Sequence, residues 1–110
     1  MRARPGLLDT PLERWLELDP AGFARRFEGM AILRAGRGGF LRNVCVALGN
    51  RRDPASVPAL KRALDDDDPL VRGAAAWALH RIGDAASVAA LAARRAVEHD
   101  EDVVAELAPA

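Results

Sequence analysis

The stretch DPASVPAL at residues 53–60 recurs 31 positions later as DAASVAAL at residues 84–91, with six of its eight letters unchanged. Agreement this close within one short chain indicates an internal repeat. The shared letters put an aspartate that can cap a helix in front of apolar residues at helical spacing. A unit of this kind cannot bury its apolar face alone and has to stack on a neighbouring copy. The repeat therefore predicts an α-solenoid.

Size and composition fit one small globular domain. The chain has 110 residues, of which 50% are hydrophobic and 29% are charged, and it contains no apolar run of about 18 residues that could span a membrane. One cysteine rules out a disulfide within the chain, and one cysteine with two histidines is too few for a structural zinc or an iron–sulfur cluster. We expect no membrane partner and a reducing, cytoplasmic setting.

The net charge of zero conceals two halves of opposite sign. Residues 1–52 contain ten arginines and five acidic side chains, whereas residues 53–110 contain six basic and eleven acidic side chains. Residues 25–52 alone carry a net charge of +6. A separation of this kind indicates that one end of the molecule meets an anion.

Capping residues mark the predicted helix starts, because their side-chain oxygens accept an orphan backbone amide and a following proline has no amide to leave unpaired. These capping residues are Thr10, Asp19, Asp53, Asp68, Asp84 and Asp100. Gly29, Gly83 and the pair Gly49–Asn50 mark predicted stops. The signals predict helices at 11–18, 20–28, 38–48, 54–64, 69–82, 85–97 and 101–107, with an ambiguous glycine-bearing connector at 30–39.

We therefore expect an all-α solenoid of about six to seven helices in one domain. An atypical N-terminal helical pair with a connector would occupy 1–37, and repeated helix pairs would occupy 38–110, with units near 38–64 and 69–97 and a truncated last helix. Each helix should bury one apolar stripe. The predicted stripes are Leu41, Val44, Cys45 and Leu48; Val57, Leu60 and Leu64; Leu70, Ala74, Trp77 and the stem of Arg81; and Val88, Leu91 and the stem of Arg95.

Residues 53–84, DPASVPALKRALDDDDPLVRGAAAWALHRIGD, resemble a HEAT-like repeat of the phycobilin-lyase type. The shared features are an Asp-Pro cap, the pattern V..L...L, an acidic turn and the pattern VR..A...AL. This resemblance implies a scaffold and does not by itself imply a function.

A longer stretch, about residues 7–83, is similar to the C-terminal region of bacterial tRNA epoxyqueuosine reductases, the enzymes of the last step of queuosine synthesis. The distinctive part is LRNVCVALGN at 41–50, an Arg-Asn…Gly-Asn element. The other matching positions are Phe23, Phe27, Gly29, Arg34, Gly36 and AAWAL at 75–79. The chain departs from the family pattern at Met30–Leu33, which precede Arg34, and at Ala74 and His80.

The chemistry of that family belongs to upstream domains that hold cobalamin and 4Fe-4S clusters. The cysteines of those clusters and the cobalamin domain are not in this sequence. The resemblance therefore implies an accessory domain or fragment with no cofactor, no small-molecule substrate and no activity of its own. Its implied partner is tRNA, and upstream reductase domains or another protein are further candidates.

An arginine-rich segment supplies the candidate RNA-binding residues: Arg34, Arg37, Arg42, Asn43, Asn50, Arg51 and Arg52. Arginine binds phosphate oxygens in a bidentate way, and glycines at 36, 38 and 39 would leave backbone amides open at a helix start. Arg72 stands at the equivalent place in the next repeat, beside Asp65–Asp68, and we expect it to join helices. Asn50 could instead close its helix.

Other residues favour structural roles. Trp77 within AAAWAL is typical of a core, although both tryptophans could stack on bases and Trp15 could dock on a missing domain. Cys45 between two valines is typical of a buried thiol. The run Asp65–Asp68 is typical of a solvated turn whose last residue caps the next helix. No nucleophile is paired with a base.

Two functions stay open from the sequence. The first is a non-catalytic HEAT-repeat domain of an epoxyqueuosine reductase that positions tRNA through its backbone. The second is a stand-alone HEAT-repeat adaptor that binds another protein through its concave face or its open ends.

Overall fold

The computed structural model describes residues 11–29 and 32–109, with side chains from residue 36 onward in the second range. Every regular element in these ranges is helical, which confirms the predicted all-α fold. The elements are α1 (Leu12–Trp15), α2 (Pro20–Arg26), α3 (Ile32–Arg51), the 3-10 helix η1 (Pro54–Ser56), α4 (Val57–Ala63), α5 (Pro69–Ile82), α6 (Ala85–Arg95) and α7 (Glu101–Leu107).

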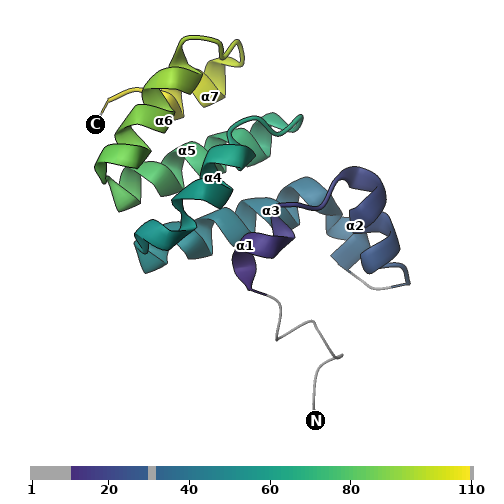
Figure 1. Ribbon diagram of the computed structural model, residues 1–110. Helices are drawn as coiled ribbons and strands as arrows, with labels where there is room; N and C mark the ends of the chain where they lie inside the picture. The colour runs from purple at the N-terminus through teal and green to yellow at the C-terminus, as the bar shows by residue number, and fades with distance from the viewer. Residues whose placement is uncertain (1–10, 30–31, 110) are drawn as a thin grey trace.

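The helices stack in two rows (Figure 1). One row consists of α3, α5 and α7, each packed on the next, and the other consists of α1, α4 and α6. The stack measures 43 × 26 × 16 Å along its principal axes. This side-by-side arrangement of helix pairs is a short solenoid, as the repeat predicts.

Five of the six predicted capping residues, all of them aspartates, begin helices as expected. Asp19, Asp53, Asp68, Asp84 and Asp100 each accept a hydrogen bond from a backbone amide two or three residues later, with N–O distances between 2.6 and 3.1 Å. The sixth, Thr10, lies outside the described residues. Gly83 ends α5 in the left-handed conformation, with φ of 67°, which also agrees with the prediction.

The predicted stop at Gly49–Asn50 is wrong. Helix α3 continues to Arg51, and Arg52 adopts a left-handed φ of 55°. Gly49 has a packing role instead: a Cβ atom there would lie 2.9 Å from the Cα of Ala78 on α5. Glycine therefore lets α3 and α5 approach each other closely, and Asn50 stays exposed on a continuous helix.

The connector at 30–39 is partly helical. Helix α3 begins at Ile32 and is interrupted at Gly36, whose φ of 86° and ψ of 160° are outside the helical region. A residue with a side chain would be strained at that φ. The break divides α3 into a short first turn and a long helix from residue 37 onward.

The core confirms the predicted stripe on α3 and corrects two others. Leu41, Val44, Cys45 and Leu48 are all buried. On α5, however, the buried residues are Val71, Ala75, Ala76, Ala78 and Leu79. The predicted α5 stripe of Leu70, Ala74 and Trp77 lies on a partly open face, with Leu70 48% exposed.

Val88 on α6 is also outside the core, being 59% exposed, although its repeat equivalent Val57 is buried. Arg95 does not pack its stem into the core as predicted. Its guanidinium group donates to the carbonyl oxygen of Leu107 and so caps the C-terminus of α7.

An aromatic cluster closes the N-terminal end of the core. Trp15, Phe23 and Phe27 are buried, and Phe40 of α3 packs against all three with ring centroids between 5.1 and 5.8 Å apart. Trp15 is therefore a core residue and is not free to dock elsewhere. Arg26 lies over its ring, with the guanidinium carbon 5.2 Å from the centroid.

Candidate functional site

The outer side of α3 carries most of the predicted RNA-binding residues. Arg42, Asn43 and Asn50 are exposed on this helix, and Arg51 and Arg52 are exposed at its end. Arg42 and Asn50 are eight residues apart, which corresponds to about 12 Å along a helix. Their side chains therefore form a polar strip along the helix rather than a point cluster. The side chain of Arg34 lies outside the described residues.

Arg42 has little to neutralise it. Among the described residues, its guanidinium group forms one hydrogen bond, from Nη1 to Oδ1 of Asn43 at 3.3 Å. Arg51 is 53% exposed, and its NH1 lies 4.0 Å from Oε2 of Glu13, the longest ion-pair distance found in the described ranges. That Glu13 oxygen also accepts a hydrogen bond from Ser56, at 2.8 Å. Both guanidinium groups keep charge available for an anion.

Arg37 is different, because an acid of the same chain already pairs with it. Its guanidinium group forms a two-pronged ion pair with Asp66 and donates from Nε to the carbonyl oxygen of Leu18 at 2.7 Å. The side chain is only 14% exposed. Arg37 therefore lies outside the exposed strip and fastens α3 to the turn between α4 and α5.

The predicted anion-binding position at the glycine-rich start of α3 is already occupied by a carboxylate of the same chain. Gly38 faces Asp68, so closely that a Cβ atom on Gly38 would collide with the carboxylate. Asp68 is the residue that caps α5 through the amide of Leu70. The start of the long part of α3 therefore meets a carboxylate of its own chain, and it does not offer an open anion-binding pocket.

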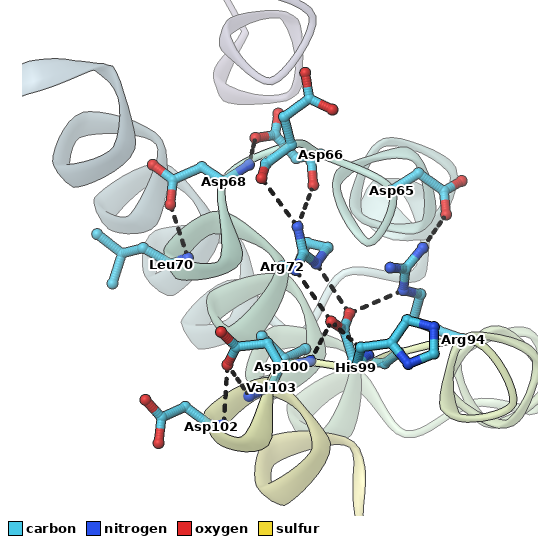
Figure 2. A network of polar contacts seen from close by, with 12 residues as sticks. Asp65, Asp66, Asp68, Leu70, Arg72, Arg94, His99, Asp100, Asp102 and Val103 are labelled. Atoms are coloured by element: carbon cyan, nitrogen blue, oxygen red, sulfur yellow. Dashed lines mark hydrogen bonds and ion pairs between the residues drawn. The ribbon is translucent and has the colours of Figure 1, made fainter.

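Arg72 lies at the centre of a polar network that joins successive helix pairs (Figure 2). Its Nε and NH2 donate to the two carboxylate oxygens of Glu98 at 2.9 and 3.0 Å, and its NH1 donates to the carbonyl oxygens of Asp66 and Asp67. Arg94 donates to the same Glu98 carboxylate at 3.0 Å and to Asp65 at 3.1 Å. Arg72 has the structural role that its place beside the acidic turn predicts.

Glu98 is the most strongly perturbed carboxylate of the network. Its side chain is only 1% exposed, and although burial raises its pKa, hydrogen bonds from Arg72, the backbone amide of Asp100 and Arg94 lower it further. The net effect is that the pKa of Glu98 falls from 4.5 to about 2. The carboxylate is ionised at neutral pH and serves structure.

Arg81 is a candidate that the sequence reasoning placed in the core instead. It is exposed at the end of α5, with its guanidinium carbon 5.4 Å from the ring centroid of Trp77. Because Gly49 of α3 faces Trp77, Arg81 lies about one turn beyond, towards the end of α3 that bears Arg52. Arg81 stands in the last turn of α5, as Arg51 stands in the last turn of α3, and this equivalent place in the repeat is the sequence signal that could have identified it.

The described residues contain neither a cluster of metal-binding side chains nor an activated thiol. Those residues contain no group of three or more histidine, cysteine, aspartate or glutamate side chains able to hold a metal ion. Burial raises the pKa of the Cys45 thiol to about 12, so the thiolate that a nucleophile requires is not formed at neutral pH. None of the described helices is both long and apolar enough to cross a bilayer.

Three comparisons agree on the relatives of this chain. The family model for HEAT repeats matches residues 30–110. An epoxyqueuosine reductase of Listeria monocytogenes is 32% identical over 97% of the chain, and an uncharacterised protein of Geobacillus stearothermophilus, from the region 3′ of gldA, is 31% identical over 97%. These matches confirm the resemblance to epoxyqueuosine reductases that the sequence indicates.

The fold agrees with solved structures. A crystal structure of an epoxyqueuosine reductase with a tRNA-Tyr epoxyqueuosine-modified tRNA stem loop superposes on 87% of this chain, with a TM-score of 0.80 and 30% identity. The chain spans 26% of that protein, 28% of the Listeria enzyme and 50% of the Geobacillus protein. It therefore corresponds to a part of the longer relatives.

Proposed function

This chain belongs to the HEAT-repeat family, and we propose that it is a non-catalytic domain of the epoxyqueuosine reductase type that holds tRNA by its backbone. The chemistry would belong to the parts of the relatives that this chain does not span. Those parts would supply cobalamin and 4Fe-4S clusters, and this chain would supply a surface that positions the RNA in the cytoplasm.

The observation that carries the proposal is the exposed strip on α3. Arg42, Asn43 and Asn50 extend along the helix, and Arg51 and Arg52 continue the strip at its end. Guanidinium groups bind phosphate oxygens without reading bases, and asparagine amides can donate to phosphates or ribose hydroxyls. A strip about 12 Å long suits several contacts along one RNA backbone. Arg34 stays a predicted member of the strip.

A second observation supports the same assignment. Three of the six basic side chains in residues 53–110 are engaged: Arg72 and Arg94 bind Glu98, and Arg95 caps α7. Lys61 and Arg62 are exposed on α4, and Arg81 is exposed at the Arg52 end of the strip. Arg81 therefore extends the basic strip of α3 onto the neighbouring end of α5.

The test is binding of a tRNA-Tyr stem loop to the chain, measured by fluorescence anisotropy at salt concentrations from about 50 to 200 mM. Each phosphate contact contributes about −0.7 to the slope of log K against log salt for single-stranded RNA. The triple variant Arg42→Gln/Arg51→Gln/Arg52→Gln should therefore reduce the slope by about 2 and weaken binding by at least about tenfold at low salt.

The matched control is Arg14→Gln/Lys61→Gln/Arg62→Gln, which removes the same charge from exposed positions on α1 and α4. It should change binding by less than about threefold, because long-range steering alone is weak beyond a Debye length. Equal losses in the two triple variants, or an affinity that does not depend on salt, would mean that α3 does not hold the RNA.

A further inference from the structure

A groove lies next to the exposed strip of α3, between α3 and α7. Its volume is about 610 Å³, and the helices that line it are α3, α5 and α7, which are neighbours in one row of the stack. Arg42 and Val46 belong to α3, Leu70, Gly73, Ala74 and Trp77 to α5, and Val103 and Glu106 to α7. Solenoids commonly use a surface formed by one row of helices for binding.

The floor of the groove is an apolar stripe that the fold leaves only partly buried. Leu70, Ala74 and Trp77 recur at helical spacing on α5, yet they face the groove, and Leu70 is 48% exposed. The core of the molecule is completed by the opposite face of the same helix. Leu70 and Trp77 lie against α3 on one side, next to Gly38 and Gly49, and the rest of the stripe stays open. A regular apolar stripe that is only partly covered is suited to a partner's apolar side chains.

The rim of the groove is acidic. Asp68, Asp100, Asp102 and Glu106 line it, and Arg42 is the single basic side chain in the lining. Asp68 and Asp100 each use one oxygen, Oδ1, to cap a helix. Asp102 and Glu106 are exposed, and neither forms an ion pair with a described residue. The groove therefore carries a surplus of negative charge next to an apolar floor.

From this combination we propose that the groove between α3 and α7 binds a basic amphipathic helix of a protein partner. Apolar side chains on one face of that helix would lie on the stripe of Leu70, Ala74 and Trp77, and lysine or arginine side chains beside them would meet the acidic wall of α7. The stripe extends over seven residues, about 10 Å, which matches two turns of a bound helix. A groove of this kind recognises a helix by its apolar side chains at the spacing i, i+3, i+4 and i+7.

The same charges disfavour nucleic acid in the groove. An RNA backbone would meet four carboxylates and one guanidinium group there, and like charges at close range repel. The groove and the exposed strip of α3 thus suit partners of opposite charge, and Arg42 lies on their shared border. This inference does not rest on the proposed RNA function.

The test uses the whole chain and a designed fluorescent peptide of leucine and lysine, with leucines at the spacing i, i+3, i+4 and i+7. Controls are the scrambled peptide and the version with glutamate in place of lysine. We expect the first peptide to bind and to shift the indole NMR signal of Trp77 but not that of buried Trp15. The variant Asp102→Asn/Glu106→Gln should weaken binding about tenfold at low salt, and Leu70→Ser about fivefold.

Matched control variants are available for both kinds of change. Glu28→Gln/Glu101→Gln removes two exposed charges outside the groove, and Val88→Ser polarises a side chain that is 59% exposed on α6. Both should bind the peptide as the wild type does. The proposal is wrong if the glutamate or scrambled peptide binds equally well, if the Asp102/Glu106 variant retains full affinity, or if the tRNA stem loop displaces the peptide and shifts Trp77. A loss of RNA binding alone would not contradict the groove proposal, because RNA binding and peptide binding are measured separately.

Discussion

Replacing Glu98 by glutamine should destabilise the domain more than any other single charge-neutralising change in the described residues. Glutamine has nearly the same shape but removes the charge that Arg72 and Arg94 share (Figure 2). It also replaces the carboxylate oxygen Oε2 by an amide nitrogen, which is a donor only. That nitrogen cannot accept the hydrogen bonds that Oε2 receives from Nη2 of Arg72 and from the backbone amides of His99 and Asp100.

The magnitude follows from the pKa. A fall from 4.5 to about 2 corresponds to roughly 3.4 kcal/mol at about 1.36 kcal/mol per pKa unit. Glutamine keeps the oxygen that accepts hydrogen bonds from Nε of Arg72 and Nε of Arg94, so we expect a smaller loss, of about 2 kcal/mol. The melting temperature should then fall by about 8 °C or more, at about 4 to 8 °C per kcal/mol for a domain of this size.

The pH dependence gives a sharper test. Because the pKa of folded Glu98 is depressed, its ionised form contributes stability that is fully present above about pH 4.5 and is lost as the pH falls towards 2. The free energies of unfolding in urea of the wild type and of Glu98→Gln should therefore differ at pH 7 and converge as the pH falls from about 4.5 to 2. The control is Glu28→Gln, which neutralises an exposed carboxylate on the first described segment. A Glu98→Gln variant within about 0.5 kcal/mol of the wild type at pH 7, or a difference independent of pH, would refute the reasoning.

Three further changes test the fold. Gly49→Ala should lower the free energy of unfolding in urea by about 1 to 2 kcal/mol, because the new Cβ would lie 2.9 Å from the Cα of Ala78. The control Gly39→Ala places a Cβ with no atom within 4 Å and should be neutral or stabilising. Equal effects of the two substitutions would disprove the close approach of α3 and α5. Asp19→Ala should cost about 1 kcal/mol by removing the cap of α2, and an unchanged urea midpoint would contradict that role. Cys45 should react with a thiol-specific disulfide reagent at pH 8 only at the rate of unfolding, and reaction within seconds in the native state would show that it is not buried.

The sequence predicts the helices well because their start signals are local. An aspartate followed by proline, as at Asp53 and Asp68, needs only its next few residues to form a cap. The helix class and the repeat follow from the same local information. The stop at Gly49 is wrong because glycine serves two purposes, a helix end or a close helix contact, and only the neighbouring helix decides between them.

Tertiary pairings account for the other differences. Arg37 and Asp66 are 29 residues apart, and charge counting cannot tell that this arginine is neutralised while Arg42 is not. The apolar stripe on α5 shows the same limitation, since helical spacing identifies a stripe but not which face meets another helix. In a two-row stack, the face with Trp77 stays partly open, whereas the face with Leu79 is buried.

The arginine–carboxylate links have a consequence for assembly of the chain. Arg37 of α3 binds the turn between α4 and α5, and Arg72 of α5 binds the loop between α6 and α7, over separations of 29 and 26 residues. Loops of that length cost little entropy to close, and each bond involves only adjacent layers. Folding can therefore start at one junction and spread to its neighbour. The junction of Arg72, Arg94 and Glu98 has the most bonds, so we expect order to grow from it towards α1.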